Sequence, residues 1–290
     1  VWDAQTGASI AVLEGHPQGL RHARFSPDGE RIVTASDDGM VRLWDGLSGA
    51  EIAVLEGHKN NLRSVTFSPN GERIVTASDD HTARLWDGRT GREIAVLRGH
   101  TRDLQSATFS PAGDRVVTTS IDTTARLWDA RTGAAIAVLT GHRGGVHSAW
   151  FDASGRRFVT DSSDNTVRMW DAYTGSALAV FSGHKSNVVS AQFSPSGQQV
   201  VTASGDGTAR IWDTTPEAVV LRGHDTDSRG APQRVNTAVF SPSGDQVVTA
   251  SDDKTCRVWD IKTGEQLRVQ RPPIGNDYEG RLYSVAMSPD

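Results

Sequence analysis

The segment from residue 15 to residue 45 reads GHPQGLRHARFSPDGERIVTASDDGMVRLWD, and its alternation of short runs and turns decides the fold. Leu20–Phe25, Arg31–Ser36 and Met40–Trp44 are runs with alternating or β-branched apolar residues, and a fourth run, Glu51–Leu55, follows them. Ser-Pro-Asp-Gly and Asp-Asp-Gly turns separate the runs, and helical 3.6-residue periodicity is absent. Runs bounded by Gly, Pro and Asp indicate antiparallel strands. The segment therefore predicts a four-stranded meander, whose strands are called a to d below.

This unit is repeated along essentially the whole chain. Trp-Asp pairs begin at Trp2, Trp44, Trp86, Trp128, Trp170, Trp212 and Trp259. Their spacing is 42 residues five times and then 47 residues. Gly-His pairs begin at Gly15, Gly57, Gly99, Gly141, Gly183 and Gly223. One small sheet cannot cover both of its own faces, so neighbouring units must stack.

The composition excludes several classes of protein. The chain has 290 residues, a net charge of -5 and 37% hydrophobic residues, with no apolar run near the roughly 18 residues of a membrane span. A nucleic-acid-binding protein usually carries a basic excess, which is absent here. The single cysteine, Cys256, cannot form an internal disulfide, so a cytoplasmic location is expected. The chain opens at Val1 within a repeat and lacks an initiator methionine, so we expect a piece of a longer protein.

The 42-residue period, the Gly-His and Trp-Asp pairs, and the Thr-x-Ser-x-Asp run between them resemble the WD-repeat family. The Arg-, Ala-, Gly- and Asp-rich style of the repeats is similar to that of bacterial WD-repeat arrays. The resemblance implies an all-β protein, a β-propeller of four-stranded antiparallel blades. It also implies that the Gly-His loops and the b–c turns lie on one face, which is called the top face below.

Counting the units predicts a seven-bladed propeller in one domain, residues 1–290. Six units are complete, and the seventh is split between the two termini. Leu282–Met287 would supply its strand a, and Ile10–Leu13 would supply its strand d. Fourteen residues, which would hold strand b and most of strand c, have no counterpart in the chain. An excised stretch of a longer array is an alternative explanation of these ends.

The most regular polar residues match the buried Asp–His–Thr–Trp hydrogen-bonded tetrad of the family. The six sets are His16, Thr34, Asp38 and Trp44; His58, Thr76, Asp80 and Trp86; His100, Thr118, Asp122 and Trp128; His142, Thr160, Asp164 and Trp170; His184, Thr202, Asp206 and Trp212; and His224, Thr249, Asp253 and Trp259. A hydrolytic triad is the alternative, but it needs an exposed nucleophile and an oxyanion hole. Six identical copies favour folding chemistry, so we expect no enzyme activity.

Other recurring or clustered groups also receive structural explanations. An arginine precedes each full-unit Trp by two residues, on the same strand face, and a cross-strand ion pair with a nearby Asp is expected. Cys256 is expected to be a buried small hydrophobe. Asp225 and Asp227 are similar to the start of a calcium loop, but Arg229 and Asn236 occupy ligand positions. We therefore expect no metal site and no cofactor.

In the family, partners bind the top face through three kinds of position. The residues three after the Gly-His histidine are Gly19, Asn61, Asp103, Gly145 and Asn187, and Arg234 and Arg281 correspond to them when the last two units, whose loops are longer, are aligned backwards from Phe240 and Met287. The residues five after it are Arg21, Arg63, Gln105, His147 and Val189, and by the same alignment Asn236 and Tyr283 correspond to them. The residues before the tetrad aspartate are Asp37, Asp79, Ile121, Ser163, Gly205 and Asp252. The alternative is that the arginines simply pair with the aspartates, Arg21 with Asp37 and Arg63 with Asp79, on a solvated surface.

Two lengthened loops predict where a partner binds. Asp225–Arg234 carries an insertion of seven residues, and in the next unit Pro272-Pro273 replaces the Gly-His pair in a loop lengthened by five. We expect one binding patch there, formed by Arg234, Asn236, Arg281 and Tyr283, with Tyr278 as a further aromatic group. Rigid scaffolds carry function on their loops, although neutral drift also lengthens loops at little cost.

Two functions fit these residues. The first is a non-catalytic scaffold or sensor that captures a protein or peptide and binds neither nucleic acid nor membrane. The alternative is an architectural segment of a large multidomain signalling protein, with a nucleotide-binding or kinase domain upstream, that packs against sister domains. We expect a monomer, apart from association through the incomplete blade.

Overall fold

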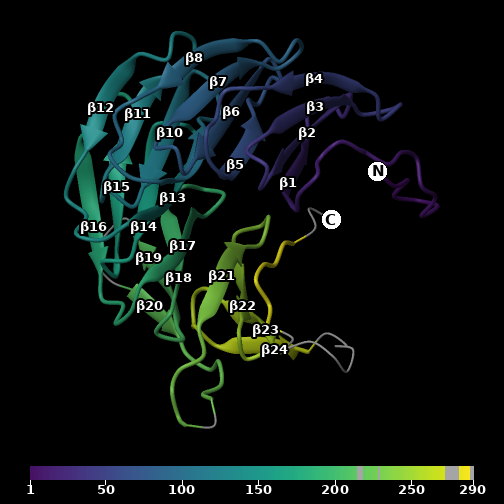
Figure 1. The fold of residues 1–290 in the computed structure, drawn as a ribbon. Helices are drawn as coiled ribbons and strands as arrows, with labels where there is room; N and C mark the ends of the chain where they lie inside the picture. Colours follow the sequence, from purple (N-terminus) through teal and green to yellow (C-terminus); the bar gives the residue numbers. More distant parts are fainter. Residues whose placement is uncertain (214–217, 228, 272–280, 288–290) are drawn as a thin grey trace. The chain divides into compact units, whose positions relative to one another are not determined.

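The computed structural model describes residues 1–213, 218–227, 229–271 and 281–287 of the chain. These residues form 24 β-strands and no helix, and accordingly contain no helix long and apolar enough to cross a membrane. The chain divides into two compact units, Val1–Thr140 and Gly141–Asp290. Every sheet has four antiparallel strands in chain order (Figure 1). The all-β architecture of six such sheets is consistent with a β-propeller.

The first unit contains three sheets. The strands are β1 (Leu20–Phe25), β2 (Arg31–Ser36), β3 (Val41–Asp45) and β4 (Glu51–Leu55); β5 (Leu62–Phe67), β6 (Arg73–Ser78), β7 (Ala83–Asp87) and β8 (Glu93–Leu97); and β9 (Leu104–Phe109), β10 (Arg115–Ser120), β11 (Ala125–Asp129) and β12 (Ala135–Leu139). The predicted four-stranded meander is therefore confirmed, and only its third strand, observed as Val41–Asp45, is shifted by one residue from the predicted Met40–Trp44.

The second unit also contains three sheets. The strands are β13 (Val146–Phe151), β14 (Arg157–Ser162), β15 (Thr166–Asp171) and β16 (Ala177–Ser182); β17 (Val188–Phe193), β18 (Gln199–Ser204), β19 (Ala209–Asp213) and β20 (Ala218–Leu221); and β21 (Val235–Phe240), β22 (Gln246–Ser251), β23 (Cys256–Asp260) and β24 (Gln266–Gln270). The length of these strands hardly varies, because the repeated turns set both of their ends.

In the c–d turns that the structure describes, the aspartate of the Trp-Asp pair closes the turn. Asp45 Oδ1 accepts hydrogen bonds from the backbone N–H of Leu47 at 3.1 Å and of Ser48 at 2.7 Å. Gly49 then adopts φ 72° and donates its N–H to the Asp45 carbonyl at 2.9 Å. Side-chain capping of a turn in this way is typical of Asp, and glycine takes the left-handed conformation without a steric cost.

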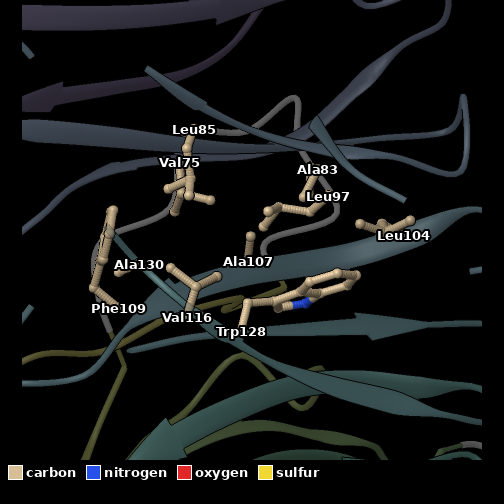
Figure 2. Packing of buried hydrophobic residues seen from close by; sticks show 11 residues of the cluster. Val75, Ala83, Leu85, Leu97, Leu104, Ala107, Phe109, Val116, Trp128 and Ala130 are labelled. Carbon is tan, nitrogen blue, oxygen red and sulfur yellow. The ribbon is translucent and has the colours of Figure 1, made fainter. Parts of the chain in front are cut away.

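The hydrophobic core lies between successive sheets of a unit. In the first unit, Val75 and Leu85 of the β5–β8 sheet face Phe109, Val116 and Trp128 of the β9–β12 sheet (Figure 2). All of these side chains are at least nine-tenths buried. The second unit repeats the arrangement between its β17–β20 and β21–β24 sheets. Burial of this apolar area stabilises the stack by about 25 cal/mol per Å², so each sheet depends on its neighbour.

The segments expected to form the seventh blade are not strands. Neither Ile10–Leu13 nor Leu282–Met287 belongs to a sheet, and the described residues contain six sheets. Near the N-terminus, an isolated bridge joins Trp2 to Ser9, and the N–H groups of Ile10 and Ala11 donate to the Val1 carbonyl at 2.9 and 3.4 Å. The expectation of two strands there was wrong because a strand needs partners for most of its backbone N–H and C=O groups, and no strand of the described residues forms a ladder with these segments.

Candidate functional site

Each of the six sheets brings together the histidine, threonine, aspartate and tryptophan that the sequence singled out. The distance from the histidine Nδ1 to the aspartate Oδ2 is 2.8–2.9 Å in all six sheets. The distance from the histidine Nε2 to the threonine Oγ1 is 2.7–2.9 Å. The indole N–H of the tryptophan donates to the same Oγ1 at 2.8–3.0 Å. The four side chains thus form one continuous chain of hydrogen bonds.

The direction of the protons in this chain follows from the donors. Because the carboxylate only accepts, the histidine donates from Nδ1, and its Nε2 accepts the threonine hydroxyl proton. The threonine oxygen in turn accepts the indole N–H. The histidine side chains are 0–3% exposed, and the threonines are 0–1% exposed. A substrate therefore has no access to the hydroxyl, which is the group that a triad would use as its nucleophile.

The tetrad histidines and aspartates of the third and fourth sheets have displaced pKa values. Burial lowers the pKa of His100 and of His142, although the partner aspartates oppose the shift. Burial alone would raise the pKa of Asp164, but hydrogen bonds from Thr166, the Arg143 amide and His142 outweigh it and lower that pKa to about 2. The geometry therefore keeps the histidine neutral and the aspartate ionised, as the hydrogen-bond directions require.

A second threonine joins five of the six networks, and the sequence analysis missed it. It lies two residues after the tetrad aspartate, and its hydroxyl donates to the aspartate Oδ1 at 2.6 Å. The five residues are Thr82, Thr124, Thr166, Thr208 and Thr255. In the first sheet Met40 has this position, and only its backbone N–H reaches Asp38, at 2.8 Å. Recurrence of threonine at this spacing was the available signal.

The backbone conformation explains why glycine precedes each tetrad histidine, since φ is 133–156° at these six positions, and the recurring arginine packs against this glycine. A Cβ added to Gly57, where φ is 152°, would lie 2.2 Å from Arg84 Nη1. Arg84 also donates to the Gly57 carbonyl at 2.7 Å and pairs with Glu93 on strand d. The expected partner of the arginine was an aspartate, and this was wrong for Arg84. Strand d pairs with strand c, so the carboxylate nearest to Arg84 of strand c is that of Glu93, the first residue of strand d.

The predicted partner-binding residues on strand a lie at β-bulges. In the β5–β6 ladder, Leu62 pairs with Ser78 and Ser64 pairs with Ala77, so Arg63 between them has no opposite residue. The same irregularity recurs in the other five sheets. The residues at the bulges are Arg21, Arg63, Gln105, His147, Val189 and Asn236. A bulge turns one side chain out of the alternating pattern, so each sheet presents one variable residue there.

In the first unit, the two arginines at the bulges are paired with carboxylates. Arg63 Nε and Nη2 donate to Asp79 at 2.6 and 2.9 Å, and Arg21 Nε donates to Asp37 at 2.5 Å. His22 also lies within 2.8 Å of the Arg63 carbonyl, which links β1 to β5. These contacts match the alternative interpretation, in which the arginines simply pair with aspartates on the surface. Such an ion pair contributes about 0–1 kcal/mol of stability when it is exposed.

In the second unit, the four residues of the expected patch lie together. Asn236 Nδ2 donates to Asp252 Oδ1 at 2.7 Å and to the Leu282 carbonyl at 2.9 Å, which attaches residues 281–283 to the end of β21. Tyr283 is 71% exposed, and Arg234 and Arg281 are exposed as well. Arg281 lines a hollow of ≈ 280 Å³ with Gln233, Asp252 and Lys254. Tyr278 and Pro272-Pro273 lie outside the described residues.

His147 is the remaining predicted residue of the second unit. Its Nε2 lies 2.9 Å from Ser163 Oγ, the residue before the tetrad aspartate of the same sheet. Burial lowers the pKa of His147, and the positive charge of Arg234 lowers it further. His147 is therefore neutral at pH 7 and close enough to Arg234 to feel its charge, which extends the patch toward β13.

The inserted loop Asp225–Arg234 is a small hairpin of its own. Thr226 and Pro232 form a bridge, and Asp227 Oδ1 accepts the backbone N–H of Arg229 at 2.8 Å and of Ala231 at 2.9 Å. A Cβ added to Gly207 would lie 2.7 Å from Cβ of Pro232, so the hairpin packs on the b–c turn of the preceding sheet. The Asp227 carboxylate caps its own turn, and the described residues contain no cluster suited to a metal ion.

Two hollows of the second unit were not anticipated. One, of ≈ 480 Å³, lies over the last sheet and is lined by Val248, Cys256 and Val258 with Val285 and Met287. Cys256 is therefore only partly buried, and the expectation of a fully buried cysteine was wrong because this sheet is incompletely covered.

The other hollow, of ≈ 320 Å³, is an aromatic groove. Trp150, Phe151, Phe193 and Phe240 line it together with Pro195. Trp150 is 47% exposed. A signal was available in the sequence, since Trp150 is the one tryptophan of eight that does not belong to a Trp-Asp pair.

Comparison with known families gives one result. Six segments match the family described as WD domain, G-beta repeat, at residues 7–45, 49–87, 91–129, 133–171, 175–213 and 217–260. No curated protein matches the chain. The matched segments together cover well over half of the residues, and the first five end at the aspartate of a Trp-Asp pair, as does the last.

Proposed function

We propose, from the premise that the chain belongs to the WD40-repeat family, that it is a non-catalytic scaffold or sensor that binds a protein or peptide. WD40 repeats generally mediate protein–protein interaction. The single observation that carries the proposal is the contrast within each sheet: the tetrad is invariant and buried, whereas the bulge position holds five different residue types in the six sheets. A position that varies in an otherwise repeated sheet carries the specificity of a binding surface.

The patch of the second unit is the best candidate for the binding site. Tyr283 offers an exposed aromatic ring, and Arg234, Lys254 and Arg281 surround the end of β21 with positive charge. No ion pair to Arg234 or Lys254 is found in the described part of the chain. Arginine and tyrosine are the side chains that most often anchor protein interfaces. The chemistry favours a peptide segment that carries a carboxylate beside an apolar side chain.

We further propose that the repeats form a single seven-bladed domain with a split seventh blade. In the first unit, a Cβ added to Gly49 would lie 2.6 Å from Cβ of Ala11, just as one at Gly91 would lie 2.7 Å from Cβ of Ala53 on strand d. Ala11 thus has the place of a strand d residue, and it exchanges backbone hydrogen bonds of 2.7 and 3.4 Å with Val1, although its segment is not a strand. The proposal also places the protein in the cytoplasm, as a monomer in a bacterial signalling system.

The experiment is a paired substitution. The unmodified chain is used to capture and identify a partner, and calorimetry then measures its affinity for the double variants Arg281→Ala with Tyr283→Ala and Asn61→Ala with Arg63→Ala. We expect the first to lose about 2 kcal/mol of binding free energy, roughly a thirty-fold weakening, while its melting temperature is kept.

The second double variant, in the first unit, is the control and should bind normally. Equal losses in both would indicate a partner that contacts many blades. No loss in either would remove the top face from consideration, and the proposal with it.

A second candidate function is architectural, and the hollow over the last sheet favours it. Leu267 and Val258 line that hollow, and Leu267 is 52% exposed while Val258 is only partly buried, so a sister domain that packed there would gain apolar contacts. Slower hydrogen exchange of β22 and β23 in a longer chain with neighbouring domains would support this second function. Unchanged exchange would contradict the architectural function, and partner binding would then be the one proposed function.

A further inference from the structure

One position in the second strand of every sheet is completely buried, and one sheet places a carboxyl group there. The six residues are Ala35, Ala77, Thr119, Asp161, Ala203 and Ala250, and each is 0% exposed. Alanine therefore satisfies the packing in four of the sheets. Thr119 adds a hydroxyl, which lies 2.9 Å from Ser106 Oγ. Asp161, on β14, is the one ionisable group in the series, and neither the tetrad nor the top-face patch uses it.

The carboxyl group of Asp161 is only half satisfied. Ser148 Oγ on the neighbouring β13 donates a hydrogen bond to Asp161 Oδ1. Asp161 Oδ2 is buried and has no hydrogen-bond partner. An ionised carboxylate seeks several donors, and although the Ser148 hydroxyl and the backbone N–H groups of Asp161 and Ser148 favour the charged form, burial outweighs them. The protonated form needs less, because it carries no net charge.

The surroundings of Asp161 are apolar. Residues 159 and 161 lie on the same face of β14, and Val159 packs in a cluster with Val188, Ala191 and Phe193 of β17. Directly opposite Asp161 on β15 lies Val167. The carboxyl group thus points into the interface where the β13–β16 sheet meets the β17–β20 sheet.

The charged groups on the surrounding strands are engaged elsewhere. Arg157 of β14 pairs with Asp152, and His147 of β13 contacts Ser163. Arg168 of β15 lies against Gly141 on the tetrad side, and Asp171 caps the c–d turn through Thr174. β17, Val188–Phe193, contains no ionisable residue. Within the described residues, then, no cation faces Asp161, and burial raises its pKa to about 7.

We propose that Asp161 is a pH-sensitive lock between the β13–β16 and β17–β20 sheets. In its protonated form the carboxyl group is accommodated in the apolar interface. Ionisation creates a buried, unpaired negative charge, which loosens the packing of β14 against β17. This role is independent of partner binding at the top face, because the interface lies inside the unit.

The sign of the effect follows from linkage. The pKa in the fold is raised above the ordinary value of 3.8, so the folded state holds the proton more tightly than the unfolded chain does. The stabilisation is fully present below about pH 4 and is lost as the pH rises through about 7. From pH 5.5 to pH 8.5 the equilibrium constant for unfolding should rise about thirty-fold on account of this one group.

The test compares the unmodified chain with Asp161→Ala by denaturant unfolding at pH 5.5, 7 and 8.5. Alanine is native at the same position in four sheets, so this variant is expected to fold. We expect the stability of the unmodified chain to fall, relative to the variant, by the thirty-fold factor across this range. The histidine networks are common to both proteins and cancel in the difference.

Thr119→Ala is the matched control, since it changes the same position of another sheet without removing an ionisable group. Its difference from the unmodified chain should be the same at all three pH values. The carboxyl carbon of Asp161, observed by NMR, should titrate near pH 7, and hydrogen exchange at β14 and β17 should quicken as it does. Parallel pH profiles for the unmodified chain and Asp161→Ala, or titration near pH 4, would overturn the proposal.

Discussion

The tetrad histidine and the bulge residue lie five positions apart in five of the six sheets, and they illustrate opposite uses of the same backbone. His58 has a carboxylate on one ring nitrogen and a hydroxyl on the other, in a site closed to solvent. Arg63 has one carboxylate partner, and 41% of its side chain is exposed. A residue with several buried partners cannot change alone, whereas a residue at a bulge can. This explains why one position repeats and the other varies.

The largest expected effect breaks the buried side of this comparison. Asp122→Ala removes the acceptor for His100 Nδ1–H and for the hydroxyl of Thr124. Leaving these donors buried and unpaired should cost on the order of 1–3 kcal/mol of unfolding free energy. Gln105→Ala, at the bulge of the same sheet, is the control and should cost less than about 0.5 kcal/mol. Denaturant midpoints measure both, and an unchanged midpoint for Asp122→Ala would show that the network is dispensable.

The second prediction separates the tetrads from the surface by pH. The pKa values of His100 and His142 are lowered by burial, so the unfolded chain binds protons that the fold does not. Their contribution to stability is present above about pH 6.5 and is lost as the pH falls below that value. Asp161 titrates with the opposite sign, so the measurement uses Asp161→Ala as its background, and denaturant unfolding of this variant at pH 7 and pH 5 should show a loss at pH 5. The loss should persist when His147→Ala is added, since both tetrad histidines remain, and a flat profile in the Asp161→Ala background would contradict the neutral-histidine network.

Particular residues show which features of the fold and of the candidate site the sequence alone could predict. The strand ranges followed from turn residues and alternation, because local sequence determines both. The bulge at Arg63 did not follow, since it depends on which residues pair across β5 and β6. A local sign did exist: Leu62 and Val65 are both buried but three residues apart, which breaks the two-residue period. The absence of strands in the described terminal segments and the Arg84–Glu93 pair depend on contacts between strands, which a single sequence does not state.

The smallest expected effect sharpens the comparison at the b–c turn, where the tetrad and the top face meet. Thr123 follows the tetrad aspartate and adopts φ 72°, a conformation that is costly for a β-branched residue. Thr123→Gly should therefore raise the unfolding free energy by about 0.5–1 kcal/mol. The reverse change, Gly39→Thr at the same turn of the first sheet, where φ is 78°, should lower it by a similar amount. Opposite shifts in melting temperature would support this strain, and equal ones would refute it.

The near-identity of the contacts between successive sheets has a consequence for how the chain finds its fold. Leu43, Leu85 and Ile211 present the same kind of apolar surface to the next strand a. During collapse, a sheet that packs against the wrong sheet thus buries almost as much apolar area as one that packs against the next sheet along the chain. The choice between them rests on connection length, because closing a loop of n residues costs about (3/2)RT ln n and the true successor is the nearest along the chain. Short, uniform loops between strand d and the next strand a therefore favour the correct order of the sheets during folding. A longer loop such as Asp225–Arg234 has a higher closure cost and favours the correct order less strongly.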